Sequence, residues 1–220
     1  MKTRFLLSAE IALLLLISPL VHAADQMTHL DAMPGSKMRI EGTSVIHDWQ
    51  VESTLIGGSL DVGSNFPIEP GQVVSPGKVA SRGQAFVTVR SLKSVEKDGR
   101  HNSDTMDEKM WELLKQPSYP RIYYRVTELV LKESPKDKNG PYLFDSKGDL
   151  AVAGVTNNIS MPVSVLPLGE QKVKITGTAP LKMTDFRVEP AGILIKTANE
   201  ITIKFEWVVG QKKAAAAATK

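Results

Sequence analysis

The strongest constraint on the fold comes from residues 200–209, EITIKFEWVV, in which apolar and polar residues alternate. The odd positions from Ile201 to Trp207 are apolar, whereas the even positions carry Thr, Lys and Glu. Side chains of a β-strand point alternately to the two faces of its sheet, so a period of two indicates a strand with one buried face. Segments 122–131 and 159–168 show the same alternation less strictly. The chain is therefore expected to be rich in half-buried strands.

Turn-forming residues separate these strands at short intervals. Asn139-Gly140 lies in a polar loop, and Asn157-Asn158 separates two apolar runs as a hairpin loop would. Many short strands with such turns favour an antiparallel sandwich or barrel. One helix is predicted within residues 101–115, where capping candidates precede an apolar stripe at helical spacing. We expect a single all-β domain that carries one short amphipathic helix.

Both ends of the chain are expected to lie outside this domain. Residues 1–23 combine two basic residues, an apolar run and a small residue at the end, which is typical of a secretory signal peptide. A retained signal anchor is the alternative, but the apolar run after Glu10 is short for a membrane span. We expect cleavage after Ala23 and a soluble periplasmic product. Residues 24–36 are then a flexible start, 37–209 the domain, and 210–220 a disordered Lys/Ala tail.

The charge of the expected domain argues against nucleic acid as a partner. The whole chain has a formal net charge of +3, to which residues 1–23 contribute +1 and residues 210–220 contribute +3, leaving −1 for the remainder. A near-neutral domain lacks the basic surface that phosphate backbones require. The chain contains no cysteine, so an exported domain must depend on its core rather than on disulfides.

The segment GTSVIHDW (residues 42–49) is the place where the sequence most suggests a reactive site. Adjacent His and Asp residues can ligate a metal or transfer a proton. If the segment is a strand, however, His47 and Asp48 point to opposite faces and cannot act on one atom. Strand parity then places His47 inside with Trp49, and Asp48 in solvent. No hydrolase, zinc-protease or nucleotide-binding motif accompanies them, so we predict no catalytic residue, no metal ligand and no cofactor.

Five segments, taken in order, resemble the YceI family of exported lipid-binding proteins. They are SLKS (91–94), DEKMWELLKQPSYPRIYY (107–124), FDSKGDLAVAGVTNNISMPVSV (144–165), VKITGTAPLKMTDF (173–186) and EITIKFEW (200–207). The resemblance implies a lipocalin-like antiparallel β-barrel of about eight strands around an elongated apolar cavity. It also implies that the cavity holds a polyisoprenoid lipid or an isoprenoid quinone, and it implies no catalytic machinery. The first strand departs from the family's commoner His-Ser pattern, so no ligand contact is transferred to His47.

Candidate site residues follow from the inward positions of the expected strands. The candidate cavity wall is Val45, Trp49, Val51, Val87, Val89, Ile122, Tyr124, Met161, Val163, Met183, Ile201, Ile203 and Phe205. The candidate rim, on the helix, is Met106, Met110, Trp111 and Leu114, and the candidate polar contact is His47. The expected partner is an isoprenoid or other long-chain lipid, with transient membrane contact; the sequence identifies no protein partner.

Three functions remain open at this point. The first is a lipid carrier or sequestering protein, in which each buried CH₂ of the ligand contributes about 0.8 kcal/mol. The second is a non-enzymatic envelope interaction or stress-response module whose barrel is filled by Trp49, Phe205 and Trp207. The third is an enzyme that uses His47 and acidic neighbours on a cavity wall. An elongated void favours the first, a filled core favours the second, and a carboxylate beside an inward His47 favours the third.

Overall fold

The computed structural model describes residues 27–190 and 197–212; the predicted signal peptide and residues 213–220 of the predicted tail lie outside these residues. In chain order the elements are β1 (Thr28–Ala32), β2 (Lys37–Ser44), β3 (Trp49–Ser53), β4 (Gly57–Val62), β5 (Gly77–Val79), β6 (Ser81–Thr88), the 3₁₀ turn η1 (Val89–Ser91), β7 (Lys93–Val95), α1 (Asp104–Leu113), β8 (Arg121–Glu133), β9 (Tyr142–Val152), β10 (Val155–Gly169), β11 (Lys172–Lys182), the 3₁₀ turn η2 (Met183–Phe186) and β12 (Thr197–Gly210).

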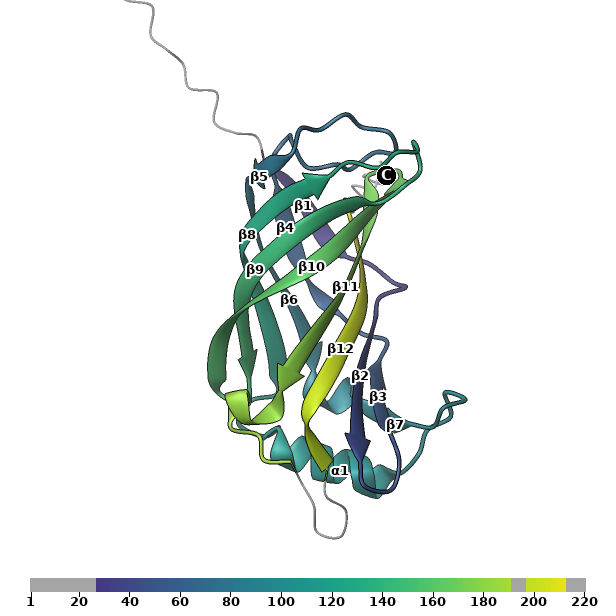
Figure 1. Ribbon diagram of the computed structural model, residues 1–220, viewed down its shortest axis with the longest axis vertical. Helices are drawn as coiled ribbons and strands as arrows, with labels where there is room; N and C mark the ends of the chain where they lie inside the picture. Colours follow the sequence, from purple (N-terminus) through teal and green to yellow (C-terminus); the bar gives the residue numbers. More distant parts are fainter. Residues whose placement is uncertain (1–26, 191–196, 213–220) are drawn as a thin grey trace, which may run out of the picture.

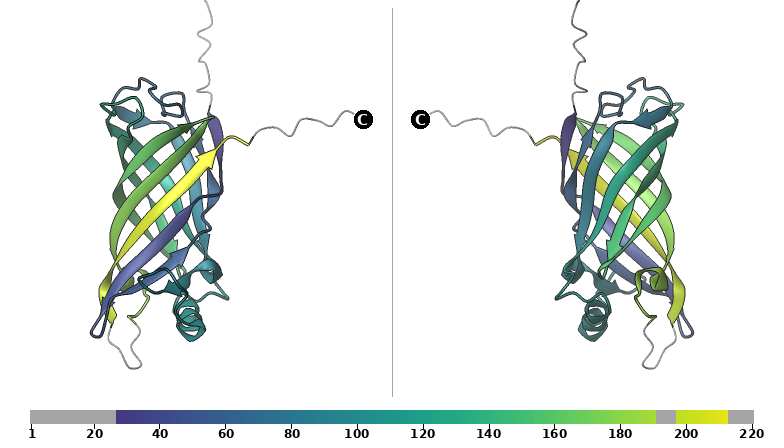
Figure 2. Two further views of the ribbon diagram at one scale, coloured as in Figure 1. Left: turned by 90° about the vertical axis from the view of Figure 1, so that its right-hand side faces the viewer. Right: turned by 90° about the vertical axis from the view of Figure 1, so that its left-hand side faces the viewer.

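Eight of these strands close into an antiparallel barrel (Figures 1 and 2). Hydrogen-bonded neighbours follow the order β1-β4-β6-β8-β9-β10-β11-β12, and β12 pairs again with β1. β2, β3 and β7 extend the sheet from β12, and β5 pairs with β8. The predicted fold, an all-β barrel with one short helix, is confirmed. No helix among the described residues is long and apolar enough to cross a membrane.

The barrel includes β1, which lies in the segment expected to be flexible. Leu30 is fully buried opposite Leu60 of β4, so β1 is an integral strand of the closed sheet. On the outer face, His29 Nδ1 lies 2.6 Å from a carboxylate oxygen of Asp61. A five-residue strand with one large apolar side chain gives too little alternation to be recognised from sequence. The domain therefore starts before residue 37.

The hairpin between β9 and β10 turns at Ala153-Gly154 and not at Asn157-Asn158. Both turn residues have positive φ, 49° for Ala153 and 87° for Gly154, as a two-residue hairpin loop requires. Asn157 and Asn158 are instead part of β10, where polar side chains reach Asp185 and Asp149. Gly154 adopts the positive φ that the turn needs without steric cost. The predicted hairpin loop at Asn157-Asn158 was therefore wrong. The predicted turn at Asn139-Gly140 is confirmed.

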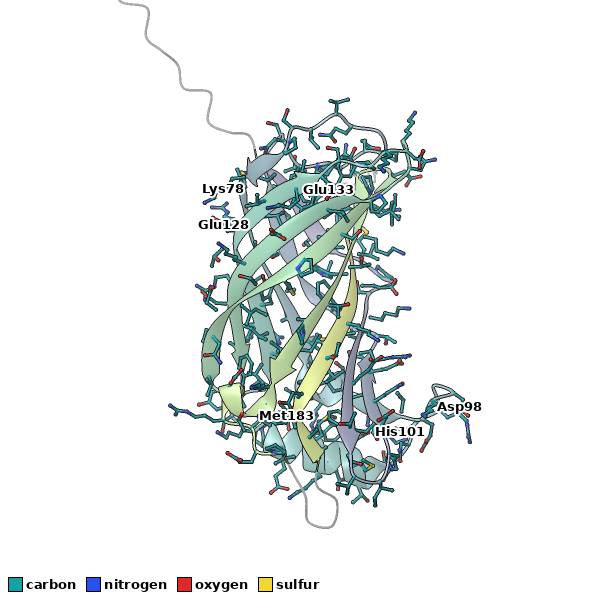
Figure 3. The ribbon with its side chains drawn as sticks, viewed as in Figure 1. Lys78, Asp98, His101, Glu128, Glu133 and Met183 are labelled. Carbon is teal, nitrogen blue, oxygen red and sulfur yellow. The ribbon has the colours of Figure 1, made fainter. Side chains whose placement is uncertain are left out.

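One end of the barrel is closed by the segment between β4 and β5. The ring of Phe66 from this segment is fully buried and lies 5.8 Å from the ring of Phe144 on β9. The hydroxyl of Tyr142 donates a hydrogen bond to the carbonyl of Gln72 in the same segment. Figure 3 marks this end by Lys78 and Glu128, and the opposite end by Met183 and His101. Helix α1 lies across that opposite end (Figure 1).

Candidate functional site

A cavity of about 1260 Å³ occupies the barrel interior, and its lining extends to α1 at the open end. It is lined by residues of α1, of η2 and of the β2–β3 turn, whereas Phe66 and Phe144 of the closed end lie beyond its floor. Typical pockets for small molecules hold about 300–1000 Å³, so this volume suits a larger or longer ligand. The lining is overwhelmingly apolar because successive barrel strands each present every second residue to the interior.

The cavity stays hollow because large rings lie flat against its wall, over glycines of the neighbouring strand. A Cβ on Gly177 would come within 2.6 Å of the Phe205 ring, and one on Gly148 within 2.6 Å of the Tyr124 ring. Gly42 is covered in the same way by the indole of Trp49. Each ring thus uses the space that a side chain on the glycine would take. This packing leaves the centre of the barrel free.

Most of the candidate wall residues line this cavity, and two do not. Those that line it are Trp49, Val51, Val87, Ile122, Tyr124, Met161, Val163, Met183, Ile201, Ile203 and Phe205. Whether they contact a ligand stays a prediction. Val89 is fully buried but belongs to η1, which follows the end of β6 and turns out of the wall. Strand parity does not apply across such a turn, which is why the placement of Val89 was wrong.

The expected strand through Val45 and His47 is a turn. β2 ends at Ser44 and β3 begins at Trp49, and Ser44 N donates to the carbonyl of His47 at 3.1 Å. The Ser44 hydroxyl accepts from His47 N at 3.2 Å and so stabilises the turn. Val45 is 74% exposed, so its assignment to the wall is wrong.

His47 is exposed at the cavity mouth rather than inside the wall. Its Nδ1 lies 2.9 Å from the carbonyl oxygen of Asp48, and no ion pair joins its ring to a carboxylate among residues 27–190 and 197–212. His47 and Asp48 both line the mouth and lie in a turn, so the strand parity predicted to separate them does not apply. The arrangement required for the enzyme hypothesis, a carboxylate beside an inward His47, is absent from this described part of the chain.

Helix α1 forms part of the rim, but with a different orientation of Trp111. Met106, Met110 and Leu114 line the cavity, as expected from their helical spacing. Trp111 faces the opposite side, where its indole N–H donates to the carbonyl of Leu92 at 3.1 Å and Lys93 Nζ lies 4.6 Å from the ring centroid. Its role is therefore to attach α1 to the barrel, because it lies on the helix face that meets β7.

A buried carboxylate fixes α1 at the mouth. Asp107 has no exposed surface; its Oδ1 accepts from Ser94 N at 2.6 Å, and its Oδ2 lies 3.0 Å from Lys93 Nζ and 2.9 Å from His101 Nε2. Burial opposes ionisation of Asp107, but these three donors together lower its pKa below the usual value. Ser103 caps the helix by accepting from Met106 N.

Three groups at this anchor have the spacing of metal ligands. Ligand atoms of His101, Asp104 and Asp107 lie within 4.8 Å of one another. The ammonium group of Lys93 already supplies positive charge to the Asp107 carboxylate. We therefore interpret these three residues, with Lys93, as an ion-pair network that holds the helix.

Inside the cavity, one polar contact was not anticipated from sequence. Tyr124 Oη on β8 and Ser146 Oγ on β9 lie 2.8 Å apart, and both residues line the cavity. Burial raises the pKa of Tyr124, so its hydroxyl keeps its proton at neutral pH. The inward alternation of β9 at Phe144, Ser146 and Gly148 was the available signal for Ser146.

The match to a known family covers most of the described chain. The family model of the YceI-like domain matches residues 36–209. Among curated proteins, no relative matches the chain.

Two solved structures share the fold at low sequence identity. A polyisoprenoid-binding domain from Saccharophagus degradans, implicated in plant cell wall breakdown, is 14% identical, with a TM-score of 0.61 over 85% of this chain and 100% of that domain. BcnA of Burkholderia cenocepacia is 16% identical, with a TM-score of 0.56 over 79% of this chain and 95% of its own. At such identities the likeness establishes the barrel fold and not the ligand.

Proposed function

The chain belongs to the YceI-like domain family, and from this membership we propose that it holds an isoprenoid-type lipid, a polyisoprenoid or an isoprenoid quinone, in its barrel. The protein then transports, stores or sequesters that lipid in the periplasm, to which the signal-like residues 1–23 direct it. The observation that carries the proposal is the apolar cavity of about 1260 Å³ with one open end.

The cavity favours this function over a filled interaction module. A barrel used only as a rigid surface gains stability from a packed interior, because empty apolar space forfeits dispersion contacts. Of the three rings expected to fill such a core, Trp49 and Phe205 lie over glycines of the wall, and Trp207 is buried but still borders the cavity, so the lumen remains open. An extended hydrocarbon chain restores the missing contacts at about 0.8 kcal/mol for each buried CH₂. The wall needs no charged group to bind such a chain.

Native mass spectrometry of the exported protein, purified without detergent, tests this function. We expect a mass above that of the polypeptide, which extraction with organic solvent removes and which proves to be one isoprenoid-type lipid. The delipidated barrel should bind an added isoprenoid with a 1:1 stoichiometry. A delipidated, folded protein that ignores every added isoprenoid would contradict the proposal.

The tip of the β2–β3 turn can contact a membrane while the barrel takes up its lipid. Val45 and Ile46 form this tip at the cavity mouth and are 74% and 67% exposed, whereas turns usually carry polar residues. Burying both side chains in a bilayer gains about 1.5–3 kcal/mol each. Two residues are too few for a stable protein interface, which covers about 800 Å² on each partner. We therefore propose a lipid bilayer as the surface that this tip contacts.

Replacing Val45 and Ile46 together by serine should slow the transfer of a fluorescent isoprenoid between phosphatidylcholine vesicles by about tenfold or more. The mouth carries both signs of charge, such as Arg100 and Glu108, so anionic lipid should change the rate little. Val73→Ser is the matched control, because Val73 is 97% exposed at the closed end. Equal slowing by the control variant, or unchanged transfer by the double variant, contradicts the assignment of the tip.

A further inference from the structure

The hydroxyl pair of Tyr124 and Ser146 is not required to fill the cavity wall. Phenylalanine and alanine at these positions would occupy nearly the same space without hydroxyl groups. Burying a hydroxyl costs free energy that a single hydrogen bond only partly offsets. The pair therefore places two hydroxyl groups in an apolar lumen at a cost in folding free energy. The hydrogen bonds that it can still form indicate what it can bind.

The pair retains one hydroxyl hydrogen that can be donated. The two hydroxyls bring two hydrogens, and their mutual bond of 2.8 Å uses one of them. Within residues 27–190 and 197–212, the structure records no second partner for either oxygen. When Ser146 donates to Tyr124, the tyrosine hydrogen becomes available, and the first bond strengthens the second. Because the Tyr124 hydroxyl keeps its proton, it acts as a donor at neutral pH.

The free hydrogen can reach the lumen at a position inside the barrel, between the mouth and the closed end. Tyr124 is inward-facing and only partly buried, so its accessible surface faces the cavity. Ser146 is 3% exposed and lies opposite Leu129, two residues from Phe144 of the closed end. Trp207 also lines the cavity and its indole N–H lacks a partner in the described chain, but that nitrogen has almost no accessible surface. Tyr124 is thus the donor that an inserted ligand meets.

Charged groups are confined to the other end of the cavity. Those that line it belong to α1, to the segment between β7 and α1, to the β2–β3 turn and to the residue Glu189 after η2. A phosphate or carboxylate placed beside Tyr124 would therefore have no cation to compensate its desolvation. An uncharged acceptor, such as a carbonyl oxygen, requires only the single donor that is present.

We propose that the Tyr124 hydroxyl, positioned by Ser146, binds an uncharged hydrogen-bond acceptor, a ketone-type carbonyl oxygen, at the inserted end of the lipid. The lipid then enters with this end first and leaves its remaining chain toward the mouth. This assignment rests on the proposed function, because it requires a lipid in the lumen.

A matched pair of ligands tests the assignment. The first probe is geranylgeranylacetone, an isoprenoid methyl ketone, and the second is the hydrocarbon in which the ketone oxygen is replaced by two hydrogens. In Tyr124→Phe we expect the ketone to bind about fivefold to tenfold more weakly, with hydrocarbon binding unchanged. Ser146→Ala should weaken ketone binding by a smaller factor. Tyr123→Phe, on the outer face of the same strand, is the control and should alter neither.

The carbonyl stretch of the bound ketone provides a second measurement. It should lie at lower frequency in the wild-type protein than in Tyr124→Phe, because a hydrogen bond weakens the C=O bond. If both probes bind the wild-type barrel and their affinity ratio is the same in Tyr124→Phe, the assignment is overturned while the proposed function stands. If neither probe binds the folded wild-type barrel, the proposed function fails and the assignment fails with it.

Discussion

Gly177→Val is expected to lower the affinity for an isoprenoid by about 100-fold while the barrel still folds. The added side chain would occupy the place of the Phe205 ring, which lies 2.6 Å from the position of a Cβ on Gly177. The ring must then turn into the lumen and displace about four CH₂ groups of the ligand, a loss of about 3 kcal/mol. Isothermal titration with a delipidated sample measures the affinity, and circular dichroism verifies the fold.

Two further variants separate this effect from general damage. Gly57 is covered by the ring of Phe86, which packs with Tyr123 on the outer face of β6 although Phe86 borders the cavity, so Gly57→Val should lower the affinity far less than Gly177→Val does. Adding Phe205→Ala to Gly177→Val should restore binding to within about tenfold of the wild type, because it returns the lost volume. Wild-type affinity in a folded Gly177→Val protein would refute the account of the hollow lumen.

Asp107→Ala is expected to destabilise the protein by about 3 kcal/mol, because it leaves Ser94 N without an acceptor and Lys93 without its buried partner. For a domain of this size the melting temperature should fall by about 6–12 °C. The loss should be accompanied by faster release of a bound lipid, since α1 is held at the mouth by this carboxylate. Differential scanning calorimetry and stopped-flow displacement measure the two effects.

The same carboxylate sets an acid limit on stability. The pKa of Asp107 is lowered in the folded state, so its contribution is present above the ordinary aspartate value of 3.8 and is lost as the pH falls through the folded-state pKa. The stability difference between wild type and Asp107→Ala should therefore shrink below about pH 4. Asp104→Ala is the control, because the Asp104 side chain is 87% exposed and touches the same His101. If both variants melt at the same temperature, Asp107 is not the anchor.

Much of the barrel could be predicted from sequence because its strands are buried on one face only. The alternation in β12 and β10 is a direct consequence of that burial, and the inward residues could be identified from parity once each strand was recognised. The turn at Val45-Ile46 could not be predicted in this way. Both residues favour strands, and what ends β2 is the Ser44 side chain bonding to the backbone of His47.

The finer features of the cavity depend on contacts between strands that a single sequence does not specify. The register between β8 and β9 shifts between Val126 and Glu128, and the contact of Tyr124 with Ser146 forms within that shifted pairing. Likewise, Gly177 lies beside Phe205 only because β11 and β12 pair in one particular register. A glycine or serine in isolation carries no sign of these neighbours. The sequence pattern predicts that the strands exist, but it does not specify which strands pair or in which register.

Because the segment that carries Phe66 closes one end, the barrel cavity has a single opening and is not a channel. A lipid that enters by the mouth cannot continue through the far end, so it must withdraw along the path by which it came. Uptake and release of the lipid then follow the same path in opposite directions, so the path itself favours neither process. For a carrier of the proposed kind, the net direction of lipid movement then comes from the two surfaces that it contacts, through the difference in chemical potential of the lipid between them.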